Sequence, residues 1–212
     1  MKIRRLRRSE LPVGTVALTR FLIGKTVVHD LPAGRVSGRI VEAEAYPPGD
    51  PAGHHYRGPT PRIRSMYLAP GHAYVFFNYG AHFMLNVSAE PEGIAGGILI
   101  RALEPIDGIP LMEQHRKTTR LLDLTRGPGR LAAALQIDRS HDGLDLCAPG
   151  PLWLGVAVGP SASPAGPIGR TVRIGITRAA NRPLRFYERG NPFVSGPKRL
   201  LGPSPSSVKR KR

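Results

Sequence analysis

The sequence has one cysteine, one tryptophan and no long apolar run. Because Cys147 has no second cysteine to pair with, a disulfide framework within the chain and a CxxC-type metal site are excluded. No apolar stretch approaches the roughly 20 residues of a membrane-spanning helix. In a secretion signal an apolar segment follows the charged start, but none follows MKIRRLRR in this sequence. We therefore expect a protein of a reducing, cytoplasmic compartment that folds without a metal or disulfide.

Acidic residues are also scarce, since 31 Lys and Arg stand against 15 Asp and Glu and give a formal net charge of +16. This charge indicates a polyanionic partner and predicts a nucleoid-associated protein. Residues 1–8 and 198–212 carry eleven of the basic groups and no acid, and removing them leaves 20 basic and 15 acidic groups, or +5. We expect both segments to be flexible basic tails. Non-specific attraction to phosphate and a merely solubilising role explain them equally well.

The length of 212 residues suits one domain, and 25 glycines and 22 prolines spread through it favour many short elements joined by turns. Apolar periodicity predicts helices over 11–24, 108–122 and 128–137. It predicts strands over 25–30, 35–46, 72–79, 82–88, 96–103, 151–158 and 170–177. The fold expected for residues 9–197 is therefore α+β, a single domain with a curved, mostly antiparallel β-sheet surrounded by helices.

Two acids share one face of the strand that ends at Tyr46. Alternation places Glu42, Glu44 and Tyr46 on one face and Val41 with Ala43 and Ala45 on the other. An isolated pair of this kind is ordinarily part of a solvated outer face. Here, however, the strand leads into a loop rich in imidazole, aromatic and guanidinium groups, a mixture that a purely structural loop seldom needs. The chemically mixed residues of this loop are His54, His55, Tyr56, Arg57, Arg62 and Arg64.

An aromatic cluster follows in the segment HAYVFFNYG. Rings beside basic groups can stack on nucleobases, whereas rings in a strand more often fill the core. We expect Tyr74 and Phe77 to be core residues. Tyr79 adjoins Gly80 at a turn, where a ring is placed to wedge into a duplex.

Two polar residues interrupt apolar strands. Arg101 must be paired or face a polar cavity, because burying its charge alone is unfavourable, and Glu44 and Glu104 are its candidate partners. Asn86 either bonds to neighbouring backbone or faces a ligand.

Two functions of different classes remain compatible with these residues. A metal-dependent nuclease or phosphoesterase would use Glu42, Glu44 and one of His54 or His55 as ligands. A non-catalytic DNA-binding protein would use its basic tails and an inserted Tyr79.

Several motifs follow one another along the chain: VEAEAY, HHYRGPTPR, MYLAPGHAYVFFNYG, MLNVS, ILIRALEP, RGPGRLAAAL and RPLRFYERGNPFVS. Together and in this order they resemble the alkyladenine (3-methyladenine) DNA glycosylase family, in its bacterial type, and the resemblance covers about residues 12–196. The resemblance implies base-excision repair of double-stranded DNA. The enzyme would remove purines such as 3-methyladenine, 7-methylguanine, hypoxanthine and ethenoadenine, without metal, cofactor or covalent intermediate. No lysine lies in these motifs, so we expect a monofunctional enzyme without lyase activity. We also expect a monomer with no obligate protein partner.

The resemblance further implies a role for each matching residue. Glu44 matches the general base that activates the attacking water, Glu42 a structural acid, and Arg101 an arginine that helps to hold this water and a phosphate. The residues matched to the flipped base are Tyr46, His55, Phe76 and Asn86, of which Asn86 disfavours the exocyclic amine of guanine. The residues expected to contact DNA are the wedge Tyr79 and Arg57, Arg62, Arg64 and His82.

The sequence departs from the family pattern at a few positions. Phe76 stands where some relatives have tyrosine, and Ile63 where asparagine is usual. Ala81 and the segment 177–181 also differ from the continuation expected beside the wedge and after Ile174. Substrate range is where these changes are expected to appear.

Overall fold

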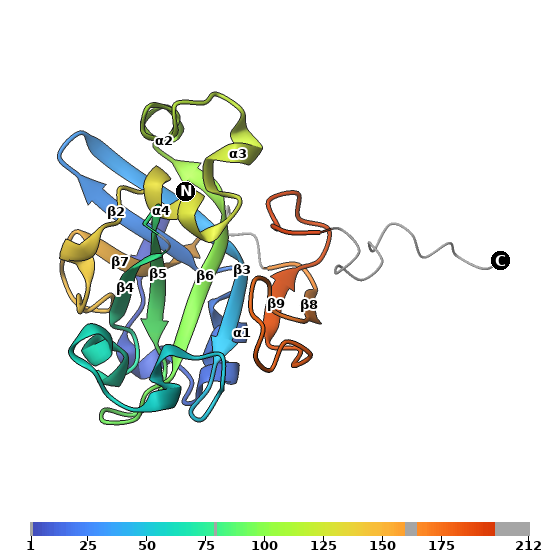
Figure 1. Ribbon diagram of the computed structural model, residues 1–212. Coiled ribbons are helices and arrows are strands. Elements are labelled where there is room, and N and C mark those ends of the chain that lie inside the picture. The colour runs from blue at the N-terminus through green and yellow to red at the C-terminus, as the bar shows by residue number, and fades with distance from the viewer. Residues whose placement is uncertain (1, 79, 160–164, 198–212) are drawn as a thin grey trace.

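The computed structural model describes residues 2–78, 80–159 and 165–197, and strands dominate this part of the chain (Figure 1). The strands are β1 (Lys2–Arg5), β2 (Thr26–Leu31), β3 (Gly34–Tyr46), β4 (Ala73–Asn78), β5 (His82–Ser88), β6 (Gly97–Asp107), β7 (Leu152–Val158), β8 (Ile168–Thr171) and β9 (Arg185–Glu188). The α-helices are α1 (Thr15–Leu22), α2 (Ile109–Arg116), α3 (Leu121–Thr125) and α4 (Pro128–Ala134). Short 3-10 helices cover Arg8–Glu10, His54–Arg57, Pro61–Tyr67 and Arg139–His141.

The described strands form one open sheet in the order β1-β7-β2-β3-β6-β5-β4, and β9 joins β3 while β8 joins β9. Every pair between these strands is antiparallel. The expected α+β domain with an antiparallel sheet is therefore confirmed. In Figure 1 the late strand β9 lies beside the early strand β3, with β8 on the far side of β9, so the C-terminal part of the domain returns to its N-terminal half.

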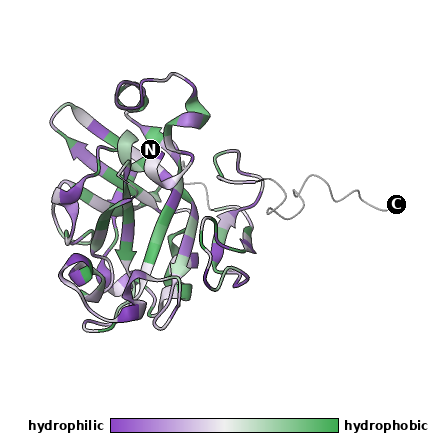
Figure 2. Cartoon of the chain, viewed as in Figure 1, coloured by the Kyte–Doolittle hydropathy of each residue, from purple (hydrophilic) through white to green (hydrophobic). Residues whose placement is uncertain are grey.

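The main core lies between the sheet and its helices, and apolar residues run along the central strands (Figure 2). Helix α1 packs on β3 and β6, and α4 packs on β5 and β6. No described helix is long and apolar enough to cross a membrane.

The alternation predicted for the acidic strand is wrong at one residue. The pairing of β3 with β6 shifts register between Ile40 and Glu42, a β-bulge that leaves Val41 without a partner in the ladder. Ile40 and Ala43 therefore both pack in the main core, while Val41 packs in a separate cluster with Phe193 and Val194. Glu42 and Glu44 share a face as predicted, but that face is buried rather than solvated.

Several predicted boundaries also differ. The strand expected over 170–177 ends at Thr171, and the strand β9 was not predicted. The helix expected over 108–122 is divided because Lys117 adopts a left-handed conformation with φ 51°.

Of the two terminal segments predicted as flexible tails, the N-terminal one is partly a strand, and the C-terminal one is not described by the structure. Residues 2–5 pair with β7, and this pairing is possible because Gly155 leaves room for the side chain of Ile3. The segment 198–212 lies outside the described residues.

Replacement of a core isoleucine tests the packing of the sheet. Ile98 is fully buried, so Ile98→Ala should lower the free energy of unfolding by about 2–5 kcal/mol through lost burial and a residual cavity. Ile94, which is 47% exposed, provides the matched control, and Ile94→Ala should change that free energy by less than about 0.5 kcal/mol. Urea denaturation measures both, and equal effects would contradict the packing described.

Candidate active site

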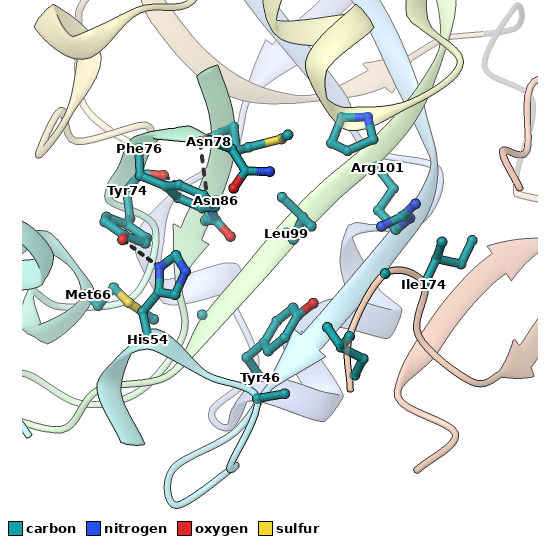
Figure 3. A pocket seen from close by; sticks show the side chains of 16 residues that line it. Tyr46, His54, Met66, Tyr74, Phe76, Asn78, Asn86, Leu99, Arg101 and Ile174 are labelled. Carbon is teal, nitrogen blue, oxygen red and sulfur yellow. Dashed lines mark hydrogen bonds between the residues drawn. The ribbon is translucent and has the colours of Figure 1, made fainter. Parts of the chain in front are cut away.

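A cavity of about 420 Å³ opens beside Tyr46 at the end of β3 (Figure 3). This volume suits a small organic ligand such as a nucleobase. Its walls combine aromatic, apolar and polar side chains from β3 to β6, the 3-10 helix at residue 54 and the segment after β8. The lining residues are Tyr46, Ala52, His54, Met66, Tyr74, Phe76, Asn78, Met84, Asn86, Gly97, Leu99, Arg101, Pro128, Ile174, Gly175 and Ile176.

Glu42 lies behind the cavity wall and is fully buried. Its Oε1 accepts hydrogen bonds from Nε of Arg101 at 2.8 Å and from Nε of Arg185 at 2.6 Å. Its Oε2 accepts from the backbone N–H of Ser195 at 2.6 Å. Because two arginines and a backbone amide hold this carboxylate behind the wall, it is suited to organising the site.

Glu44 is also fully buried, yet all three groups that hold it belong to residues lining the cavity. Its Oε1 accepts from the backbone N–H of Ile174 at 2.8 Å and lies 3.2 Å from Nη1 of Arg101. Its Oε2 accepts from the hydroxyl of Tyr46 at 2.9 Å. A carboxylate has about four acceptor positions, so these three donors leave room for one further donor, such as a water.

Arg101 joins the two acids, since it contacts both Glu42 and Glu44. The prediction that this arginine must be paired is therefore confirmed. The other candidate partner, Glu104, is paired with Arg39 instead. Burial by itself lowers the pKa of Arg101, but Glu44 and Glu42 outweigh it and raise that pKa above its ordinary value, so the guanidinium stays charged.

Tyr46 stays protonated for a related reason. Burial, and then the charge of Glu44, raise the pKa of its hydroxyl above the ordinary value. The hydroxyl can therefore only donate to Glu44, while the ring of Tyr46 faces the cavity.

His54, Tyr74 and Phe76 form the opposite wall, across from Arg101 and Ile174 in Figure 3. Nδ1 of His54 lies 2.8 Å from the hydroxyl of Tyr74, and its ring meets that of Phe76 edge-on with centroids 4.5 Å apart. Burial, and then the charge of Arg62, lower the pKa of His54, so the imidazole is neutral at pH 7. Its Nε2 is then the ring nitrogen left to contact a ligand.

His55 is placed differently from the prediction. It does not line the cavity but is buried, with Nε2 2.9 Å from the carbonyl oxygen of Pro47. Neighbouring residues of a 3-10 helix point in different directions, and here the helix turns His54 toward the cavity. The HH dipeptide contains no signal that distinguishes the two.

Asn86 lines the cavity and is also bound to backbone, so its two expected roles are combined. Its Nδ2 donates to the carbonyl oxygens of Tyr74 at 3.2 Å and of Met84 at 3.3 Å. The side-chain amide is thereby held in one orientation, with its oxygen as the remaining polar atom.

The aromatic strand confirms one expectation and corrects another. Tyr74 is buried as predicted. Phe77 is 41% exposed rather than part of the core, and its ring is tilted against that of Phe83 with centroids 4.9 Å apart.

The residues expected to contact DNA are surface residues where the structure describes them. These are Arg57, Arg62, Arg64 and His82, all exposed. The guanidinium of Arg62 lies 6.0 Å from the ring of Phe76, which places its charge beside the cavity. Tyr79 lies outside the described residues.

Some participants were not singled out from the sequence. Asn78 lines the cavity, and Arg173 and Arg185 are buried behind it. The signal that drew attention to Arg101, a cation among apolar residues, is also present in VRIGI and PLRFY. In the described part of the chain, no group of three or more His, Cys, Asp and Glu side chains is arranged to hold a metal ion.

Comparisons with known proteins point to one family. A family model described as "Methylpurine-DNA glycosylase (MPG)" matches residues 10–192. A protein of Mesorhizobium japonicum named "Putative 3-methyladenine DNA glycosylase" is 63% identical over 193 residues, which cover 91% of each chain. Proteins with the same name from Paraburkholderia phytofirmans and Rubrobacter xylanophilus are 54% and 44% identical. They cover 92% and 85% of this chain and 90% and 92% of their own lengths.

Removal of Arg185 tests the role assigned to Glu42. The variant Arg185→Met leaves a buried carboxylate with one cation fewer, so the free energy of unfolding should fall by about 3–5 kcal/mol. The exposed Arg178 provides the control, and Arg178→Met should change stability by less than about 0.5 kcal/mol. Thermal and urea denaturation measure the difference, and equal stabilities would contradict the role of the ion pair.

Proposed function

Because this chain belongs to the methylpurine-DNA glycosylase family and so hydrolyses N-glycosidic bonds in DNA, we propose that Glu44 activates the attacking water. The observation that carries the proposal is the environment of Glu44. Its carboxylate is oriented by three donors, and all three belong to residues that line the cavity. A carboxylate held in this way is suited to general-base catalysis.

The proposed reaction begins with a purine nucleotide rotated out of the duplex, because C1′ is shielded within stacked DNA. Glu44 takes a proton from water as the water oxygen bonds to C1′, and the bond from C1′ to the base nitrogen breaks with its electron pair leaving on the base. Arg101 holds the water and a nearby phosphate. Damaged or mispaired bases flip at the lowest cost, which gives the first level of selection.

The cavity supplies a stacking site for the flipped base. We assign one side of the base to Tyr46 and the other to His54 and Phe76, since these rings line facing walls. In this assignment His54 takes the base-contacting role expected of His55. The substrates proposed are alkylated or deaminated purines, namely 3-methyladenine, 7-methylguanine, hypoxanthine and ethenoadenine.

Contacts outside the cavity would hold the duplex. We propose that Arg57, Arg62, Arg64 and His82 contact the DNA around the flipped nucleotide and that Tyr79 fills the gap in the stack. Residues 9–197 would form the glycosylase domain, and the basic segment 198–212 would add salt-sensitive attraction to phosphate. A monomer is sufficient, because a single lesion presents no repeated half-site.

Substitution of Glu44 tests the proposed base. Glu44→Gln should reduce the single-turnover rate on a hypoxanthine-containing duplex by about 10²- to 10⁴-fold, since the amide accepts no proton. The assay runs in EDTA and detects alkali-induced breaks at the lesion. Glu92→Gln, on the exposed surface, is the control and should retain the wild-type rate.

An unchanged rate in Glu44→Gln would rule out the general-base role. Loss of wild-type activity in EDTA would favour a metal-dependent nuclease instead. Tight binding without release of any base would favour a non-catalytic DNA-binding protein.

The absence of a lyase step is a separate prediction. Lysine does not occur among the residues that line the described cavity, so no amine is placed to attack C1′. Borohydride added during turnover should therefore trap no covalent adduct between protein and DNA. An adduct visible on a denaturing gel would show that the enzyme is not monofunctional.

Truncation of Asn86 tests how guanine is excluded. Asn86→Ala removes the amide fixed between Tyr74 and Met84, so release of unmodified guanine from a G·T mismatch should rise relative to release of hypoxanthine. Asn78→Ala removes another amide from the cavity lining and is the matched control. A guanine-to-hypoxanthine ratio equal to that of wild type would remove Asn86 from the selectivity mechanism.

A further inference from the structure

Tyr46 has two ring faces, and only one is available to a ligand. The guanidinium carbon of Arg173 lies over the ring, 4.6 Å from its centroid. The side chain of Arg173 is fully buried and does not line the cavity that Tyr46 lines. Arg173 therefore covers the ring face turned away from the cavity, and a stacked base would occupy the other face.

Arg173 is held firmly in this position. It forms a two-pronged ion pair with the buried Asp50, with Nη1 2.9 Å from Oδ2 and Nη2 3.0 Å from Oδ1. Its Nη1 also donates to the carbonyl oxygen of Ala45 at 3.0 Å. Because both charged groups are buried and the fork is rigid, the guanidinium stays against the ring whether or not a base is bound.

We propose, on the basis of the proposed function, that Arg173 is a specificity-determining residue that weakens stacking of cationic purines on Tyr46 relative to neutral ones. An aromatic face attracts a cation through its π electrons. A guanidinium on one face draws on the same electrons and repels a second cation across the ring. A neutral purine has no net charge and is affected much less.

The other contacts of Tyr46 define the size of this effect. The hydroxyl of Tyr46 donates to the anionic Glu44, which makes the ring richer in electrons and favours a cation. Asp50 balances the charge of Arg173 at long range, but the guanidinium is the group in contact with the ring. Arg173 thus counteracts the effect of Glu44 on the Tyr46 ring. The ring then favours cationic purines less strongly over neutral ones, so neutral lesions can also bind.

The test compares a cationic and a neutral substrate in the full-length protein. Duplexes carry one 7-methylguanine or one hypoxanthine, and kcat/KM is measured for each. Arg173→Gln combined with Asp50→Asn removes both buried charges together and leaves a pair of amides that can hydrogen-bond. The ratio of 7-methylguanine to hypoxanthine activity should rise by about 3- to 10-fold in this double variant, as expected for loss of a cation at an aromatic face.

Two further variants separate charge from packing. Arg173→Lys keeps the positive charge but loses the fork, so both activities should fall together with the ratio close to that of wild type. Arg173→Met combined with Asp50→Leu replaces the ion pair by two apolar side chains and is an alternative to the pair of amides. Circular dichroism shows which of these two double variants folds. The ratio is then measured in whichever neutral pair retains the native spectrum and thermal transition.

An unchanged ratio in a folded neutral pair would overturn the proposal and leave Arg173 with a structural role only. A ratio that rises equally in Arg173→Lys would also overturn it, because the charge is retained there. If neither the amide double variant nor the apolar double variant folds, the proposal is likewise overturned, and the role of Arg173 is structural only. If wild-type protein releases neither base, the proposed function itself fails, which is a distinct result.

Discussion

Three carboxylates and three arginines are buried in and behind the cavity wall, and the arrangement of this region depends on their pairing. The acids are Glu42, Glu44 and Asp50, and the arginines are Arg101, Arg173 and Arg185. Their formal charges sum to zero. An ionised group without a partner is strongly unfavourable in a protein interior, whereas a complete and hydrogen-bonded set is tolerated. The acids belong to β3 and the loop after it, and the arginines to β6 and to the C-terminal part of the domain, so the network ties distant segments together.

This requirement explains why the site is built on β3. The bulge at Val41 turns Glu42 toward Arg185 of β9 while Ile40 and Ala43 stay in the main core. Glu42 is then held by two arginines and a backbone amide, whereas the three groups that hold Glu44, two residues further along, all belong to residues that line the cavity. Two acids of identical chemistry thus acquire different environments because they meet different donors. Asp50 and Arg173 extend the same principle to the loop, where their ion pair supports the ring of Tyr46.

Local patterns predicted the strands well, because side-chain alternation directly reflects which face of a strand is buried. The strand carrying Glu42 and Glu44 and the pair of strands around Gly80 were predicted close to their observed limits. The need of Arg101 for a partner was also predictable, since it follows from the cost of burying a charge. Strand β9 was not predicted, because PLRFYER is short and its strand conformation depends on pairing with β3 and β8. Residues 2–5 were predicted as a tail for a similar reason, since only the vacant space at Gly155 of β7 makes their pairing possible.

The amino-acid sequence by itself determined the charge of the protein, its α+β class, the family motifs and the set of residue types available for chemistry. These properties depend on composition, local periodicity and motif order, which are all present in the linear chain. The tertiary structure alone decided that Arg101 binds Glu42 and Glu44 rather than Glu104, and that His54 rather than His55 faces the cavity. It also decided that Arg173 lies behind Tyr46. The physical reason is that the partner of a buried polar group is selected by packing between segments far apart in sequence, and local residue patterns contain no information about that packing.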